Sequence, residues 1–142
     1  MPEHLQGRLC VLVLVCYAGG LADAQPYLRP MLGLNPVGQS VAELPYADFQ
    51  CMLDDPPGYR NYWSAEHLAS LADPAVDAFH RSVAGMVVPS ASQHVLFPAG
   101  GVAGREPSDH PISWRRAPWV VHPFALWTDP ADDERAREWT RQ

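Results

Sequence analysis

Apolar and polar positions along the chain predict several short strands. Residues 9–17, LCVLVLVCY, form an apolar run that is rich in β-branched side chains and is terminated by glycines. Such a run predicts a strand buried on both faces. Two later runs, residues 94–102 and 117–127, combine valine with aromatic residues and predict two strands that pair as antiparallel neighbours.

Alternation along residues 119–127 predicts which side chains share a face of the sheet. One face is expected to carry Val120, His122, Phe124 and Leu126. The other is expected to carry Trp119, Val121, Pro123, Ala125 and Trp127. Because proline lacks the N–H that a ladder needs, Pro98 and Pro123 are expected at edges, in bulges or on the outward side of a pairing.

Helical periodicity is clearest over residues 74–84. A capping aspartate and a first-turn proline precede this stretch, and Val76, Phe79 and Val83 fall on one face. Gly85 stands where a helix often ends in a residue with positive φ. The pattern therefore predicts a helix that ends at residue 84.

The remaining segments are less regular. A short helix is expected from Ser64, an N-cap residue, to Leu71. A terminal helix is expected after the acidic cluster at 129–134, because acidic groups favour a helix start. Residues 21–32 have helical spacing, but two internal prolines allow only a short or kinked helix. Residues 41–53 alternate only in part, so the pattern leaves open whether they form a helix or a strand.

These elements predict an α+β fold, with an antiparallel sheet of about four or more short strands and helices packed on one face. Fifteen prolines and ten glycines among 142 residues argue against a bundle of long helices. That length fits one domain, and no linker divides the composition. Residues 1–142 are therefore expected to form a single domain.

Charge and cysteine content exclude several classes of partner. The net charge is −6 without a basic run, so nucleic acid is not an expected partner. The six histidines lack the spacing of a local metal site, and no metal is expected. Cys10, Cys16 and Cys51 are expected to be reduced and buried. In one strand Cys10 and Cys16 would lie about 20 Å apart, too far to bridge.

The N-terminal residues 1–24 have two interpretations. The apolar run at 9–17 and the small residues near 22–24 also fit a secretory signal peptide, although the leader is only weakly charged. A buried strand in a cytoplasmic protein is the other interpretation, and we prefer it. The run is too short to span a membrane, which needs about 20 apolar residues.

Four motifs follow one another along the chain: Asn61-Tyr62-Trp63-Ser64, Gly100-Gly101, Arg115 and Trp127-Thr128-Asp129-Pro130. The segments that contain them, together with the N-terminal ones, are 10–31, 44–55, 59–79, 89–105 and 114–139. In order and spacing they resemble the substrate-binding domain of berberine-bridge-enzyme-like FAD-linked oxidases, which are flavoproteins of the vanillyl-alcohol-oxidase type. The chain departs from the family pattern at Pro111, Ile112, Trp114 and Arg116.

The resemblance implies an antiparallel sheet with helices on one side and, on the other, a face that roofs the flavin ring and lines the substrate pocket. It does not extend to the family's FAD-binding domain or closing C-terminal segment. The chain is therefore expected to be an incomplete substrate-binding domain that holds no FAD alone. With the FAD-binding domain as partner, it would help to oxidise a small organic substrate by hydride transfer to FAD.

Site residues follow from the resemblance and from the chemistry of the side chains. His122 is the candidate catalytic residue, because an imidazole can orient or deprotonate a substrate hydroxyl. A hydrogen-bonded interior histidine is the alternative. The expected substrate-binding residues are Gln50, Tyr62, Trp63, Phe124 and Arg115. Core packing remains an alternative for the aromatic residues, and a loop-holding role for Arg115.

A second function from another class stays open. The chain can be a stand-alone α+β module, possibly secreted, that binds a small ligand or another protein and covers its exposed face by self-association. An exposed apolar face also predicts poor solubility. A yellow purified protein with bound FAD would contradict the incomplete-domain interpretation.

Overall fold

The computed structural model describes residues 3–55, 57–86, 90–105 and 111–142. Contacts divide the chain into two units, residues 1–56 and 57–142. Composition does not change at this boundary, although the sequence there, Pro-Pro-Gly at 56–58, is a turn signal. Each unit is described by itself.

The first unit contains two helices, α1 (Leu21–Leu32) and α2 (Tyr46–Gln50), and the 3-10 turns Glu3–Leu5 and Cys51–Leu53. Helix α1 occupies all of residues 21–32 and includes both prolines, where the pattern predicts only a short or kinked helix. The strand predicted over 9–17 is wrong, because this segment joins no ladder and Val11 is 95% exposed. An apolar β-branched run becomes a strand only where a partner strand is available to accept its hydrogen bonds.

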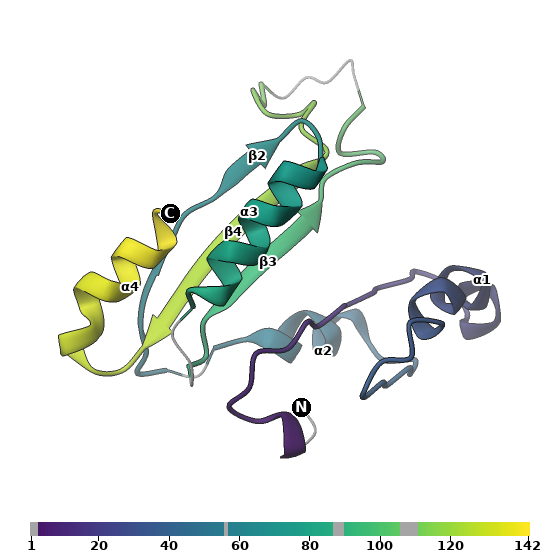
Figure 1. The fold of residues 1–142 in the computed structure, drawn as a ribbon. Coiled ribbons are helices and arrows are strands. Elements are labelled where there is room, and N and C mark those ends of the chain that lie inside the picture. Colours follow the sequence, from purple (N-terminus) through teal and green to yellow (C-terminus); the bar gives the residue numbers. More distant parts are fainter. Residues whose placement is uncertain (1–2, 56, 87–89, 106–110) are drawn as a thin grey trace. The chain divides into compact units, whose positions relative to one another are not determined.

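The second unit is a sheet with two helices (Figure 1). Its elements in order are β1 (Arg60–Trp63), β2 (Glu66–Leu68), α3 (Asp73–Ala84), β3 (Gln93–Pro98), β4 (Trp119–Trp127), a 3-10 turn (Pro130–Asp132) and α4 (Asp133–Thr140). The sheet is antiparallel and four-stranded, which confirms the predicted α+β fold. The loop before β4 includes residues 106–110, which lie outside the described residues.

Strand β4 is the centre of the sheet. On one side it pairs with β3, from Gln93 opposite Phe124 to Pro98 opposite Trp119, as the two later apolar runs predict. On the other side it pairs with β1 and then with β2. β1 and β2 share one continuous register, since Trp63 lies opposite Phe124 and Glu66 lies opposite Val121, three residues further along both strands.

The two prolines have different positions in this sheet. Pro98 ends the edge strand β3, as expected. Pro123 lies in the middle of the central strand and not at an edge or bulge, but its nitrogen points away from the pairing with β3, which is the third of its expected placements. Its carbonyl accepts from the Ser64 N–H at 3.3 Å, but it has no N–H to return. The missing bond coincides with the gap between β1 and β2.

Both helices of this unit lie on the same face of the sheet. Phe79 of α3 packs on His94 of β3, with ring centroids 4.3 Å apart. The Trp139 indole of α4 donates to the Ser82 carbonyl of α3 at 2.8 Å. The buried cluster beneath the helices consists of Ala125, Trp127, Ala136 and Trp139, with Tyr62 and Met86 packed against it. The odd-numbered residues of β4 therefore face the helices, as their alternation predicts.

Of two helices predicted in this unit, one is confirmed and one is wrong. The helix predicted over 74–84 is confirmed as α3, although Gly85 has φ −84° and not the expected positive value. The short helix predicted from Ser64 to Leu71 is wrong, because residues 66–68 form β2. Pairing with β4 outweighs the local capping signal. The Ser64 hydroxyl donates instead to the Thr140 carbonyl at 2.8 Å.

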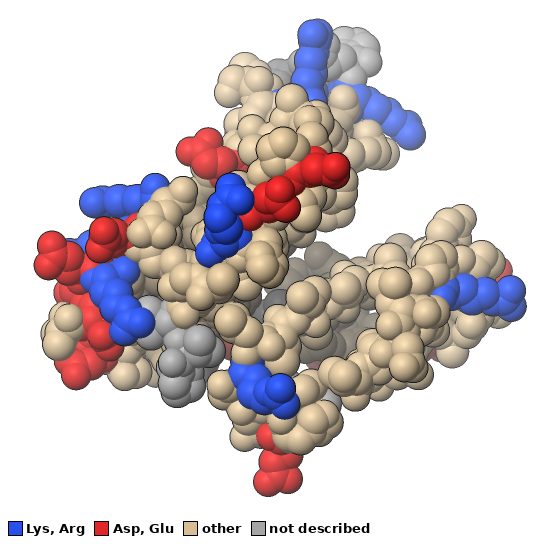
Figure 2. All heavy atoms as spheres, viewed as in Figure 1, with Lys and Arg blue, Asp and Glu red and all other residues tan. Residues whose placement is uncertain are grey.

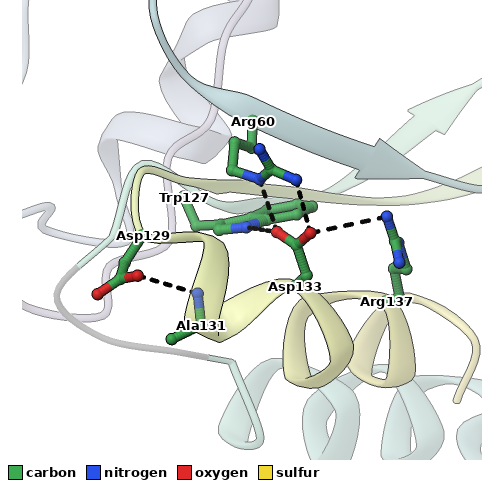
Figure 3. A network of polar contacts seen from close by, with 6 residues as sticks. All are labelled: Arg60, Trp127, Asp129, Ala131, Asp133 and Arg137. Carbon is green, nitrogen blue, oxygen red and sulfur yellow. Dashed lines mark hydrogen bonds and ion pairs between the residues drawn. The ribbon is translucent and has the colours of Figure 1, made fainter.

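A polar network joins the start of α4 to the sheet (Figure 3). Arg60 of β1 donates through Nε and a terminal nitrogen to both carboxylate oxygens of Asp133, each at 2.6 Å. The Trp127 indole donates to the same carboxylate at 2.8 Å, and Arg137 lies 3.8 Å from it. Hydrogen bonds from Arg60 and Trp127 hold the pKa of Asp133 below its ordinary value. The network fixes α4 against β1 and β4.

Candidate functional site

The face of the sheet opposite α3 and α4 carries a cluster of aromatic rings around His122. The ring centroid of His122 lies 5.3 Å from Trp63, 5.8 Å from Phe124 and 6.3 Å from Phe97. We call these four residues the aromatic face. Trp63 is 58% exposed and Phe97 49%, whereas His122 and Phe124 are half-buried.

Strand register explains why these rings meet. Directly opposed residues in an antiparallel pair point to the same side of a sheet. Trp63 lies opposite Phe124, Val95 lies opposite His122, and Phe97 lies opposite Val120. Three strands thus contribute to one surface, although their residues lie far apart in the chain.

Charged side chains are absent from this side of the paired strands. The described residues on it are Asn61, Trp63, His67, Gln93, Val95, Phe97, Val120, His122, Phe124 and Leu126, of which Leu126 is fully buried. None of them is an acid, a lysine or an arginine. Such a surface is suited to a flat, uncharged ligand with few polar groups.

His122 is the titratable group within the aromatic face. Partial burial among the rings lowers its pKa below the ordinary value of 6.5. The neutral imidazole therefore predominates at pH 7, with one nitrogen able to accept a hydrogen bond. Within the described parts of the chain, no side chain hydrogen-bonds to it. The lone pair of its unprotonated nitrogen is thus available to accept a hydrogen bond from a ligand hydroxyl.

The structure brings together three of the residues singled out from the sequence: His122, Trp63 and Phe124. Tyr62 lies on the helix-covered face, where its ring packs against the core and its hydroxyl accepts from Arg141 at 3.1 Å. Arg115 donates to the Ala103 carbonyl at 3.0 Å, a contact that holds its loop. Gln50 belongs to the first unit.

Sequence reasoning missed Phe97 and the stacked pair of His67 and Trp114, whose centroids lie 4.4 Å apart. Phe97 was assigned to a strand, but its face depends on the register between β3 and β4. The period-2 pattern of one strand does not contain that register. The sequence pattern predicts a helix for His67, whereas the residue lies in β2 opposite Val120.

Charged residues gather instead on the helix side of this unit. Figure 2, seen from that side, shows acidic and basic side chains interspersed over α4. An open hollow there is lined by Asp133, Glu134, Arg137, Glu138, Arg141 and Gln142. The mixture of signs gives no single-sign field that would select a charged ligand. In the described residues no three His, Cys, Asp or Glu side chains are grouped to hold a metal ion.

Comparison with protein-family models and with curated proteins gives no match to this chain. Of the helices that the structure describes, none has both the length and the hydropathy needed to cross a bilayer.

Proposed function

We propose that residues 57–142 form the substrate-binding lid of an FAD-dependent oxidoreductase, with the aromatic face turned toward the flavin ring and the substrate. One observation carries the proposal. The sheet is covered by helices on one face, while the other face presents uncharged aromatic rings around a neutral imidazole. That asymmetry is what a lid over a flat, uncharged ring system requires.

The residues present fit an isoalloxazine ring. Trp63 and Phe97 offer exposed aromatic surface on either side of His122, and aromatic pairs gain about 0.5–1.5 kcal/mol beyond their area burial. When bound, FAD supplies the hydride acceptor, and that chemistry belongs to the cofactor. In this proposal an FAD-binding domain holds the cofactor, and this chain shapes the pocket.

His122 has the chemical role in the proposal. Its neutral imidazole accepts a hydrogen bond from a substrate hydroxyl and can hold that proton as the substrate is oxidised. Trp63 and Phe124 flank the imidazole and exclude water from one side of the substrate. A fully solvated imidazole would orient a hydroxyl less well, because water would compete for its nitrogen.

Equilibrium dialysis with FMN, which carries the isoalloxazine ring, tests the proposal on the purified 142-residue chain. The protein is expected to be colourless as isolated and to bind FMN weakly, with Kd on the order of 1 mM. Trp63→Ala and Phe97→Ala should each weaken binding about fivefold. Val76→Ala, a control at an exposed apolar site on α3, should leave binding unchanged.

Two results would contradict the proposal. One is the absence of FMN binding at several millimolar FMN. The other is an equal effect of Val76→Ala and Trp63→Ala, which would indicate nonspecific association. Binding of a small aromatic alcohol without any binding of FMN would favour the second candidate, an α+β module that binds small ligands.

A further inference from the structure

Residues 9–17 expose an apolar surface and backbone N–H groups without a backbone partner among the described residues. Val11, Leu12 and Val13 are 95%, 63% and 59% exposed. Figure 1 shows the segment as an uncoiled trace before α1, and within the described residues none of its N–H groups donates to another backbone carbonyl. An apolar, β-branched run without proline or charge pairs readily with another strand.

The sequence of this segment is a palindrome. Residues 10–16 read CVLVLVC in both directions, with Val13 at the centre. If two copies pair antiparallel about a two-fold axis at Val13, Cys10 of each copy lies opposite Cys16 of the other. Val11 then lies opposite Val15, and Leu12 opposite Leu14. Such an interface is isologous, since both copies use the same surface.

Like side chains meet at every position of this register. One face of the paired strands carries only cysteine and leucine, and the other carries only valine, because alternate residues share a face. A shift by one residue would place cysteine opposite leucine or valine and would turn one strand's faces over. The palindrome therefore favours a single register.

We propose that the chain forms a two-fold homodimer through residues 10–16, in which Cys10 and Cys16 of opposite copies form disulfides on oxidation. Directly opposed residues have Cα atoms about 4.5–5.5 Å apart, within the range for a disulfide. Both thiols, like that of Cys51, are free and exposed, contrary to the expectation that the three cysteines are buried. The proposal does not depend on the proposed enzymatic function.

The redox step is balanced by a disulfide oxidant such as oxidised glutathione. Each pair of thiols loses two protons and two electrons as its S–S bond forms, and the glutathione disulfide is reduced to two glutathione thiols. The Cys10 thiol donates to the Leu5 carbonyl at 4.0 Å, and this weak, exposed contact does not prevent the thiol from forming a disulfide.

The test uses the full chain with Cys51→Ser, which leaves only the two cysteines of the palindrome. After incubation with oxidised glutathione, non-reducing electrophoresis should show a dimer, and peptide mass mapping should show Cys10 linked to Cys16. Adding Cys10→Ser or Cys16→Ser should abolish the dimer in each case. An equal mixture of these two variants should give at least ten times more disulfide-linked dimer than either variant alone, because Cys16 of one copy again lies opposite Cys10 of the other.

A charge at the axis gives an independent arm. Val13→Lys places two ammonium groups opposite each other and should lower dimer yield about tenfold. Val37→Lys, at a site 77% exposed outside the segment, should not. The proposal fails if either single-cysteine variant dimerises as well as the mixture does, if Val13→Lys leaves the yield unchanged, or if the Cys51→Ser chain stays monomeric.

Discussion

His94 lies on the helix-covered face with both ring nitrogens buried and no hydrogen-bond partner among the described residues. Phe79 covers the imidazole, and Trp139 meets it edge-on with centroids 5.9 Å apart. Burial lowers its pKa below the ordinary 6.5, and His122 lowers it further. Protonation of His94 therefore costs more free energy in the folded protein than in the unfolded chain.

Acid should destabilise the fold through His94. Because the folded pKa lies below the unfolded one, stability is lost as pH falls below about 6.5. His94→Phe should raise the free energy of unfolding by about 1 kcal/mol at pH 7, since it removes buried unpaired nitrogens. It should also flatten the loss between pH 7 and pH 5. Urea unfolding at both pH values measures this, and an unchanged pH dependence would contradict the assignment.

Trp127 stabilises the fold through its hydrogen bond to Asp133 as well as through its burial. Trp127→Phe keeps most of the apolar contact but removes the donor to a carboxylate. The thermal midpoint should fall by about 5 °C. Tyr62→Phe, which removes an exposed contact with Arg141, should change the midpoint less. Equal shifts would show that the indole bond contributes nothing specific.

Acid should also weaken the Asp133 network. Its carboxylate pKa is lowered chiefly by the hydrogen bond from Arg60, so the stabilisation is present above the ordinary value of 3.8 and is lost as pH falls further. Arg60 and Arg137 remain when Trp127 is replaced. The Trp127→Phe protein should therefore still lose stability as the pH falls below 4, as the unsubstituted protein does.

Among the elements, Pro123 explains why β1 and β2 are two strands in one register. Pro123→Val supplies the missing N–H opposite the Ser64 carbonyl. The new hydrogen bond contributes about 1 kcal/mol, and the added freedom of the unfolded chain offsets about as much. Net stability should change by less than about 1 kcal/mol, while the amides of residues 64–66 should exchange more slowly. Unchanged exchange there would contradict this account of the gap.

Elements differ in how much of them the sequence determines. The two faces of β4 follow from the alternation of its own residues, and α3 follows from its capping residues and periodicity. In contrast, residues 66–68 contain too few positions to show a period, so only their pairing with β4 makes them a strand. Residues 9–17 have a strand pattern, but a pattern cannot supply a partner. The position of Phe97 depended on inter-strand register in the same way.

At the scale of the whole molecule, the folded core belongs to the second unit. Ala125, Leu126, Trp127, Ala136 and Trp139 are buried there, whereas Ala24 is the buried apolar residue of the first unit among those described. Residues 57–142 alone should therefore unfold cooperatively, with a thermal midpoint within about 5 °C of the full chain's. Calorimetry of both proteins measures this. A shorter protein without a transition would show that the first unit is required for the fold.

We propose that the two faces of the sheet differ in function: one packs against the helices and the other binds a ligand. Amide and side-chain NMR of the full chain during FMN addition measures this difference. Resonances of Trp63, Phe97, His122 and Phe124 are expected to shift together, while those of Phe79 and Trp139 are not. Shifts confined to the helix side, or none at millimolar FMN, would contradict it.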